Sequence, residues 1–225
     1  MFMLKNCGKT KISKRLHKIA GMVKCRTMAD IGTDHGHLPI YLIQSGLADA
    51  ALATDINTKP LERAERNIDT AGLSDQIKTL LCDGLDGVDS AKYAACVISG
   101  MGGGLIINIL QRNIETSRSF EQLLLSPQRD VGDVRRFLHY NGFKINDELM
   151  LKEKGKYYNI LDISVGTQDV YDEKGYVFGD ILIRKKCEIL REYMKIEIAK
   201  VNRIGREEQK KYLWVCMEVL DCLSN

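Results

Sequence analysis

The chain has 225 residues, of which 44% are hydrophobic, enough for one main core with an appendage but too few for two large domains. No apolar run approaches the roughly 20 residues that cross a bilayer, and the first ten residues lack the apolar stretch of a secretory signal. We therefore expect a soluble, cytoplasmic protein without a membrane partner, and we treat it as a monomer.

Charge is distributed unevenly, although the net charge is only +3. Residues 1–29 contain eight Lys or Arg and no acid, whereas residues 30–177 contain 15 basic and 22 acidic residues. The crowded basic positions are Lys5, Lys9, Lys11, Lys14, Arg15 and Lys18. Such a cluster is typical of surfaces that bind the phosphates of nucleic acids. A solvated helix face and an organelle transit peptide are the alternatives, and the scarcity of Arg and Ser argues against the second.

The cysteines and histidines form no metal-binding pattern. Seven cysteines occur without a C-x-x-C spacing, and the only close histidine pair is His35 with His37. We therefore expect reduced thiols and no bound metal.

An amphipathic helix is predicted first, from Ser13 to about Cys25, because apolar residues recur there at helical spacing. Short apolar runs then alternate with helical stretches. The predicted strands are Met28–Ile31, Ala50–Thr54, Ile77–Cys82, Ala94–Ile98 and Leu123–Leu125. The predicted helices are about Leu38–Ser45, Leu61–Ala71, Leu105–Arg112 and Val131–Asn141. This alternation predicts an α/β fold with a parallel, doubly wound, Rossmann-like sheet.

The last third of the chain follows a different pattern. Lys144–Leu151 and Tyr157–Val165 have no helix between them, which predicts an antiparallel hairpin at the edge of the sheet. The polar segment Gly166–Gly175 is interpreted as a linker. Two apolar series at spacings of three and four residues follow, which predicts an antiparallel, coiled-coil-like helical extension. We therefore divide the chain into a main domain, residues 1–166, and a linker with a helical hairpin, residues 167–225.

The loop from residue 30 to 39 follows the first predicted strand and leads into a helix. In a doubly wound sheet this is where ligands bind, and Gly32 and Gly36 allow a tight turn with close approach of a ligand. A dinucleotide site would present G-x-G-x-x-G to a pyrophosphate, whereas this loop presents Asp30 and Asp34. Carboxylates suit a cationic ligand, so the loop fits S-adenosylmethionine better than NAD. An ordinary strand-to-helix turn is the alternative.

Three further strand ends carry similar groups. Asp55 ends the second strand, where an acid can accept hydrogen bonds from ribose hydroxyls. Asp83-Gly84 ends the third strand, where an adenine amino group is expected, and the glycine-rich segment 99–104 leaves bare backbone at the fourth. Each acid alone could be a helix cap or a turn residue. Acids at successive strand ends together favour a nucleoside cofactor.

Five segments, ADIGTDHGHLPIYL, DGL, ISGMGGGLIINIL, LLLSPQ and KGKYYNIL, resemble in order and spacing the bacterial tRNA (adenine-22-N1)-methyltransferase family. The resemblance runs from about Ser13 to Phe178. It implies a class I methyltransferase domain with a helical extension, S-adenosyl-L-methionine as cofactor and tRNA as substrate, with methylation at position 22 in the D-loop region. The cofactor contacts that it implies are Asp30, Gly32, Asp34, His35, Asp55, Asn57, Asp83, Gly84, Gly100 and Met101, and we add Gly36 and Gly102 from the same loops.

The sequence departs from the family pattern at three places. His37 stands where relatives often have an aromatic residue, Asp55 where many have Glu, and Ser126-Pro127-Gln128 where relatives tend to have Gln-Pro-Asn. The third departure falls beside the expected target base, to which Gln128 is predicted to hydrogen-bond while Pro127 stacks on it.

Asp34 is the predicted catalytic residue, because a carboxylate can stabilise the cationic product of N1 methylation. Binding of the methionine ammonium is its alternative role. Lys11, Lys14, Arg15 and Lys18 are predicted to hold tRNA phosphates. Two other functions remain open at this point: methylation of another RNA or nucleobase position, and RNA binding without catalysis by a protein that retains the cofactor pocket.

Overall fold

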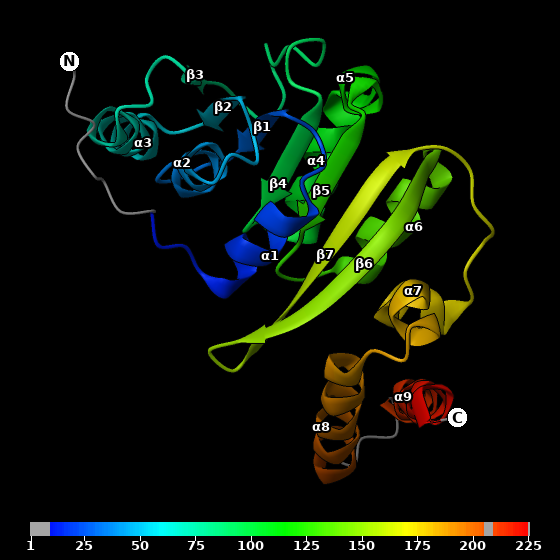
Figure 1. The fold of residues 1–225 in the computed structure, drawn as a ribbon. Coiled ribbons are helices and arrows are strands. Elements are labelled where there is room, and N and C mark those ends of the chain that lie inside the picture. The colour runs from blue at the N-terminus through cyan, green and yellow to red at the C-terminus, as the bar shows by residue number, and fades with distance from the viewer. Residues whose placement is uncertain (1–9, 205–208, 225) are drawn as a thin grey trace.

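The computed structural model describes residues 10–204 and 209–224, and among them it forms one seven-stranded sheet (Figure 1). The strand order is β3-β2-β1-β4-β5-β7-β6. The strands are β1 Thr27–Ile31, β2 Ala50–Asp55, β3 Ile77–Leu81, β4 Ala95–Ser99, β5 Gln122–Ser126, β6 Phe143–Glu153 and β7 Lys156–Val165. The first five are parallel to one another, and β7 pairs antiparallel with both β5 and β6. This topology confirms the predicted doubly wound α/β fold with a hairpin at its edge.

Helices cover both faces of the sheet. They are α1 Lys14–Met22, α2 His37–Gln44, α3 Thr58–Ala71, α4 Gly103–Arg112, α5 Ile114–Ser119 and α6 Val131–Tyr140. Apolar side chains of α1, α2 and α3 share one core with the sheet, and those of α4 and α6 share the other. Figure 1 shows the two groups of helices on opposite sides of the central strands.

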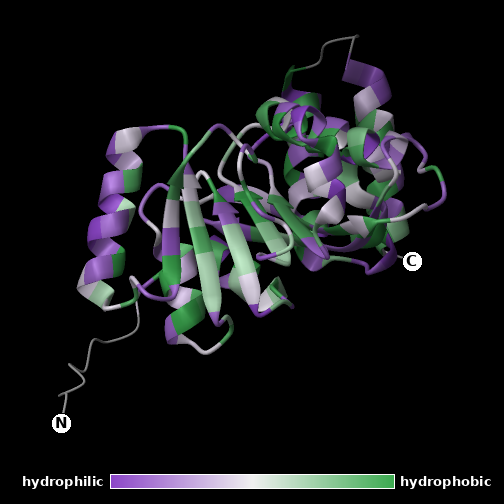
Figure 2. Ribbon diagram, turned by 90° about the horizontal axis from the view of Figure 1, so that it is seen from above, coloured by the Kyte–Doolittle hydropathy of each residue, from purple (hydrophilic) through white to green (hydrophobic). Residues whose placement is uncertain are grey.

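The central strands are buried on both faces because each supplies alternate side chains to the two cores. Leu123 and Leu125 of β5 face α4 and α6, whereas Leu124 between them faces α1 and α2. In Figure 2 these strands are mostly green, and the helices carry both green and purple. A parallel sheet buried in this way presents its strand ends, rather than its faces, to a ligand.

The helical extension has its own core. It consists of a π-helical turn η1 Gly175–Gly179, α7 Asp180–Arg184, α8 Glu188–Ile204 and α9 Lys210–Ser224. Hydrogen bonds join Arg191 to Leu223 and Tyr212 to Glu197, so α8 and α9 run antiparallel as predicted. Met150 of β6 packs into this third core, which fixes the extension against the hairpin.

Several local features differ from the sequence prediction. Helix α1 begins after Ser13, whose hydroxyl accepts a hydrogen bond from the Leu16 amide at 3.2 Å, but it ends at Met22 because Val23 is extended. Helix α5 was not predicted, and neither were η1 and α7. These elements are only five or six residues long, which is too short for a helical repeat of apolar residues to be recognised.

A buried ion pair inside the main domain also positions the residue that contacts the extension. Arg135 of α6 donates to Glu148 Oε1 of β6 at 2.6 Å, and the two side chains are 1% and 0% exposed. The same guanidinium donates to the carbonyl oxygens of Tyr176 and Val177 in η1, at 2.7 and 3.0 Å. Arg135 of α6 therefore satisfies polar groups of two other elements, β6 and η1, which meet it at the junction.

We predict that Arg135→Leu lowers the free energy of unfolding by about 3–5 kcal/mol, because it leaves Glu148 buried without its partner. Urea denaturation measures this change. The matched control is Arg184→Ala, which breaks an exposed pair with Asp180 at 2.7 Å and should cost at most about 1 kcal/mol. The double variant Arg135→Leu with Glu148→Met should recover only part of the loss, because the two η1 carbonyls are still left without a donor. A loss of under about 1 kcal/mol in the single variant would contradict this account.

Candidate active site

Two cavities open at the carboxyl ends of the parallel strands. The first, the strand-end cavity, has a volume of about 240 Å³ and is lined by residues that end β1, β2, β3 and β4. The second, the Asp34 cavity, has a volume of about 290 Å³ and is lined by the loop after β1, by α1 and by Gln128. The two share Gly32, Ser99 and Gly100, so they meet where β1 and β4 end.

Asp55 is the central acid of the strand-end cavity. It is 8% exposed, and its carboxylate accepts hydrogen bonds from the backbone N–H groups of Asn57 at 2.8 Å and Asp34 at 3.4 Å. A carboxylate has about four acceptor positions, so two remain for a ligand. The backbone bonds hold the carboxylate in place, and its remaining positions can accept from a pair of neighbouring hydroxyls.

Glycines bring backbone close to both cavities. Gly32 has a φ of +72°, and a Cβ atom there would lie 2.2 Å from the Met101 side chain. Gly100 has a φ of +83°, in the left-handed region that favours glycine. The wall shared by the two cavities is therefore made of backbone, and a side chain at Gly32 would displace Met101.

Asp83 and Gly84 line the same cavity, but Asp83 also makes an ion pair. Its carboxylate receives a hydrogen bond from Arg112 at 2.6 Å. The sequence analysis missed the apolar rim of the cavity, where Ile56 and Leu105 are 60% and 51% exposed. Exposed aliphatic side chains beside an acid suit the faces of a nucleoside base. The signal for Ile56 was present, as an apolar residue directly after the strand-end acid.

Two acids, Asp30 and Asp34, line the Asp34 cavity. Asp30 is 5% exposed and accepts a hydrogen bond from the Thr33 hydroxyl at 2.6 Å. Burial raises the pKa of Asp30 to about 6, opposed by the Thr33 hydrogen bond and the charge of Arg15. Asp34 is more open, with a side chain that is 65% exposed, and its φ of 57° is uncommon for a residue other than glycine.

Two imidazoles form another wall of this cavity. The rings of His35 and His37 stack with centroids 5.3 Å apart, and His35 Nε2 lies 3.4 Å from Asp34 Oδ2. Burial, together with the charge of His35, lowers the pKa of His37. His37 is therefore neutral at pH 7 and presents an uncharged ring, where the sequence comparison expected an aromatic residue.

The position of Arg15 differs from the prediction that it belongs to an outer phosphate-binding surface. Its guanidinium lines the Asp34 cavity, with Nη2 3.5 Å from where a Cβ of Gly100 would lie and Cζ 5.2 Å from the centre of the Tyr158 ring. Its buried Nη1 has no hydrogen-bond partner among the described residues. Arg15 therefore faces the ligand site rather than an outer surface.

The other predicted basic residues are arranged differently. Lys11 and Lys18 are exposed, and Lys14 donates to the Lys152 carbonyl at 3.1 Å, whereas Lys5 and Lys9 lie outside the described residues. Of the four predicted phosphate ligands, Arg15 lines the Asp34 cavity, and Lys11, Lys14 and Lys18 do not.

Pro127 and Gln128, which were predicted to bind the target base together, lie in different environments. Gln128 is exposed, lines the Asp34 cavity and donates its backbone N–H to the Met101 carbonyl at 2.8 Å. Pro127 is buried and lines neither cavity, so the prediction that its ring stacks on the base is wrong. The remaining predicted glycines lie at helix starts: Gly36 precedes α2 and Gly102 precedes α4.

Within residues 10–204 and 209–224, no three His, Cys, Asp or Glu side chains are grouped to hold a metal ion. No helix in this part of the chain is long and apolar enough to cross a membrane.

Comparison with known proteins places this site in a family. Residues 12–161 match the model of a methyltransferase domain. The tRNA (adenine(22)-N(1))-methyltransferase of Bacillus subtilis is 34% identical over 182 residues, which cover 78% of this chain and 76% of that protein. The chain belongs to the tRNA (adenine-22-N1)-methyltransferase family.

Solved structures of this methyltransferase family have the same fold along nearly the whole chain. The crystal structure of the B. subtilis m1A22 tRNA methyltransferase superposes with a TM-score of 0.81 at 28% identity, covering 96% of this chain and 98% of that one. An M. capricolum relative, solved with S-adenosyl-homocysteine, has a TM-score of 0.78 at 26% identity and covers 95% and 96%. The match includes the helical extension as well as the sheet.

The described residues fit S-adenosylmethionine, the cofactor of this methyltransferase family. Asp55 offers free acceptor positions for ribose hydroxyls, Ile56 and Leu105 supply apolar contacts for adenine, and the acids of the Asp34 cavity suit an ammonium group. The backbone of Gly100 lines both cavities, so it would lie beside a cofactor that occupied them.

We predict that Asp55→Ala weakens cofactor binding by about 1–3 kcal/mol, because hydrogen bonds to a charged acceptor are lost. Calorimetric titration with S-adenosylmethionine measures the change. Asp49→Ala is the matched control, since Asp49 precedes the opposite end of β2 and pairs with Arg26 on the surface. Equal affinities of the two variants would remove Asp55 from the site.

Cofactor affinity should also fall as pH is lowered through about 6, the raised pKa of Asp30, because protonation removes a negative charge from the cavity. The sign follows from the shift: burial disfavours the charged form, so the carboxyl takes up its proton well above its ordinary value of 3.8. Titrations between pH 5 and 7.5 on wild type and Asp30→Asn measure it. The asparagine variant should lose this pH dependence, and identical profiles would contradict the prediction.

Proposed function

We propose that this protein transfers the methyl group of S-adenosyl-L-methionine to N1 of adenine 22 in tRNA, in the cytoplasm. The observation that carries the proposal is the junction of the two cavities at Gly32 and Gly100, which puts the strand-end cavity, with its acid Asp55, beside a second cavity that Gln128 lines. Membership of the methyltransferase family supplies the reaction and the position on the base.

N1 of adenine already holds a lone pair in the plane of the ring, so the protein has to position the base rather than remove a proton first. When bound, the cofactor supplies a methyl group whose bond to sulfur breaks as the bond to N1 forms, with the electron pair left on sulfur. The methylated adenine is a cation until a proton leaves N6. Because N1 lies on the Watson–Crick edge, the adenine has to be unpaired or flipped out of its helix.

Three side chains of the Asp34 cavity suit these tasks. The Gln128 amide can hydrogen-bond the edge of the base, and the neutral His37 ring can contact its face. The Asp34 carboxylate lies at the cavity with most of its surface exposed, where it can stabilise the positive charge of the methylated base and accept the N6 proton. The nearby Arg15 is a second candidate contact, for the phosphate of the target nucleotide or the cofactor carboxylate.

Incubation of the protein with S-adenosylmethionine and tRNA transcripts, followed by mass spectrometric mapping of the modified nucleotide, tests the proposal. We expect one 1-methyladenosine at position 22, and none in a transcript with guanine at that position. Methylation elsewhere would favour another RNA or nucleobase specificity. Cofactor binding without transfer to any RNA would favour a non-catalytic RNA-binding protein.

We predict that Asp34→Asn lowers the single-turnover methylation rate at least about tenfold with saturating cofactor, because the charge that stabilises the product is removed. The fold should be preserved, since Asn adopts the left-handed conformation of residue 34 as readily as Asp. A normal rate would rule out catalysis by Asp34. Weaker cofactor binding with a normal rate would assign Asp34 to the methionine ammonium.

A further inference from the structure

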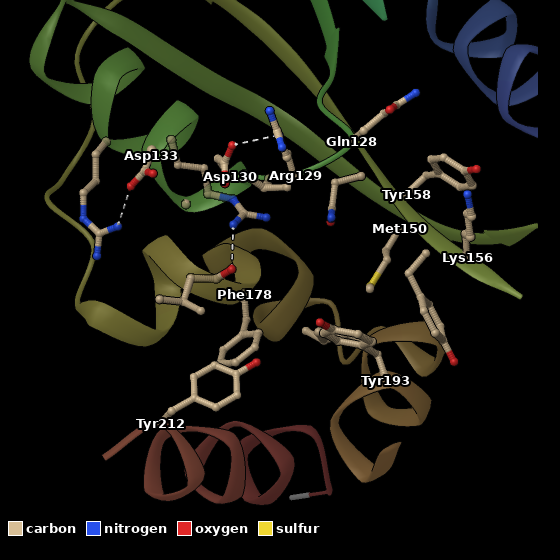
Figure 3. Close-up of a pocket in the computed structure, with 18 residues that line it drawn as sticks. Gln128, Arg129, Asp130, Asp133, Met150, Lys156, Tyr158, Phe178, Tyr193 and Tyr212 are labelled. Carbon is tan, nitrogen blue, oxygen red and sulfur yellow. Dashed lines mark hydrogen bonds and ion pairs between the residues drawn. The ribbon is translucent and has the colours of Figure 1, made fainter. Parts of the chain in front are cut away.

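A third cavity lies where the loop after β5, the β6–β7 hairpin and the helical extension meet (Figure 3). This junction cavity has a volume of about 660 Å³, within the range of sites that hold small molecules. Gln128 lines both the junction cavity and the Asp34 cavity. The two sites are therefore neighbours along one surface of the protein.

Aromatic rings line the side of the junction cavity that the extension forms. Tyr193 of α8 lies against Tyr157 of β7, with ring centroids 4.9 Å apart, and Tyr212 of α9 lines the same cavity. The hydroxyl groups are held by carboxylates of α8, because Tyr157 donates to Glu192 at 3.0 Å and Tyr212 to Glu197 at 3.2 Å. These bonds fix the rings before any ligand arrives.

Two cations, Arg129 and Lys156, also line the junction cavity, and neighbouring acids neutralise their charges only weakly. Lys156 is exposed and has no ion-pair partner among the described residues. The Arg129 side chain is 80% exposed, and its one ion pair, with Asp130, is long at 3.5 Å. In Figure 3, Arg129 and Lys156 lie on the side of the cavity that contains Gln128, and Tyr193 and Tyr212 lie on the opposite side.

This combination of side chains differs from that of a packing defect between the hairpin and the helical extension. A defect would be lined by apolar side chains alone, whereas this cavity also presents tyrosine rings, the cations Arg129 and Lys156, and the amides of Gln128 and Asn159. Rings that stack on bases, next to cations that attract phosphates, are what proteins use to hold single-stranded nucleic acid.

We propose that the junction cavity binds a second nucleotide of the tRNA, one that adjoins the target adenine along the strand. This inference rests on the proposed function. Extracting the adenine into the Asp34 cavity removes a stacking partner from its neighbour, and the tyrosine rings of the junction cavity replace that contact. Arg129 and Lys156 bind the phosphates beside it. Tyr158 links the two sites, because it lines the junction cavity and lies against Arg15 of the Asp34 cavity.

The first test compares the affinities of variants for a full-length tRNA substrate. Tyr193→Leu should weaken tRNA binding by roughly 5-fold to 150-fold, the effect of losing one stacked base, while Tyr193→Phe retains it. The matched control is Tyr140→Leu, because Tyr140 is 70% exposed and lines none of the three cavities. Cofactor affinity and melting temperature are measured for each variant.

Lys156→Gln gives a second test that does not depend on the extension remaining folded, because Lys156 is exposed on the hairpin. It should flatten the log–log salt dependence of tRNA binding by roughly 0.7–0.9, the value for one phosphate contact. Lys154→Gln, two residues away in the hairpin turn and outside the cavity, is the control. Photocrosslinking with 5-iodouridine next to the target position should label peptides that contain Tyr193 or Tyr212.

The outcomes separate this inference from the proposed function. A wild-type protein that methylates adenine 22, together with unchanged tRNA affinity in Tyr193→Leu and an unchanged salt slope in Lys156→Gln, overturns the junction site and leaves the function standing. Absence of adenine methylation in the wild type overturns the function instead. Binding of free adenosine monophosphate that requires Tyr193, without an effect on tRNA, would assign the cavity to a free nucleotide and overturn the RNA contact.

Discussion

Parallel strand pairing determines where the residues that line the strand-end cavity and the Asp34 cavity lie. The strands are paired so that their last residues are neighbours: Ile31 of β1 lies beside Thr54 of β2 and Ile98 of β4, and Ser99 lies beside Ser126 of β5. The residues that follow these ends come from points of the chain up to about 100 positions apart, yet they surround one crevice. Hydrogen bonds of the turns then fix the acids, so the sheet supplies both the location and the rigidity of the site.

The parts of the fold and site that follow from this constraint could be predicted from sequence. An apolar run that ends in an acid was enough to place Asp55, and the absence of a helix between two runs was enough for the β6–β7 hairpin. Tertiary contacts were not predictable in the same way. Arg15 belongs to a basic run in the sequence, but packing of α1 turns it toward the Asp34 cavity, and Pro127 is buried although it follows a strand end.

The helical extension depends on a different interaction, the buried pair of Arg135 and Glu148. Ion pairs without solvent cost desolvation energy, so a pair of apolar residues could give equal stability. The guanidinium does something an apolar residue cannot, because it also donates to two carbonyl groups of η1. Those contacts fix the turn before Phe178, which packs into the core of the extension. A directional contact therefore helps to fix the junction cavity relative to the Asp34 cavity.

The cofactor and RNA have opposite charges, so different residues have to bind them. The cofactor is a cation and requires acids, but RNA is a polyanion that the same acids repel, so its phosphates need positively charged partners. Arg15 affects the charge of this cavity, because its positive charge counteracts the rise in the pKa of Asp30 that burial produces. Loss of that charge would favour the protonated carboxyl and weaken the attraction for a cation. Arg15 thus favours the ionised form of Asp30, as the hydrogen bond from Thr33 also does.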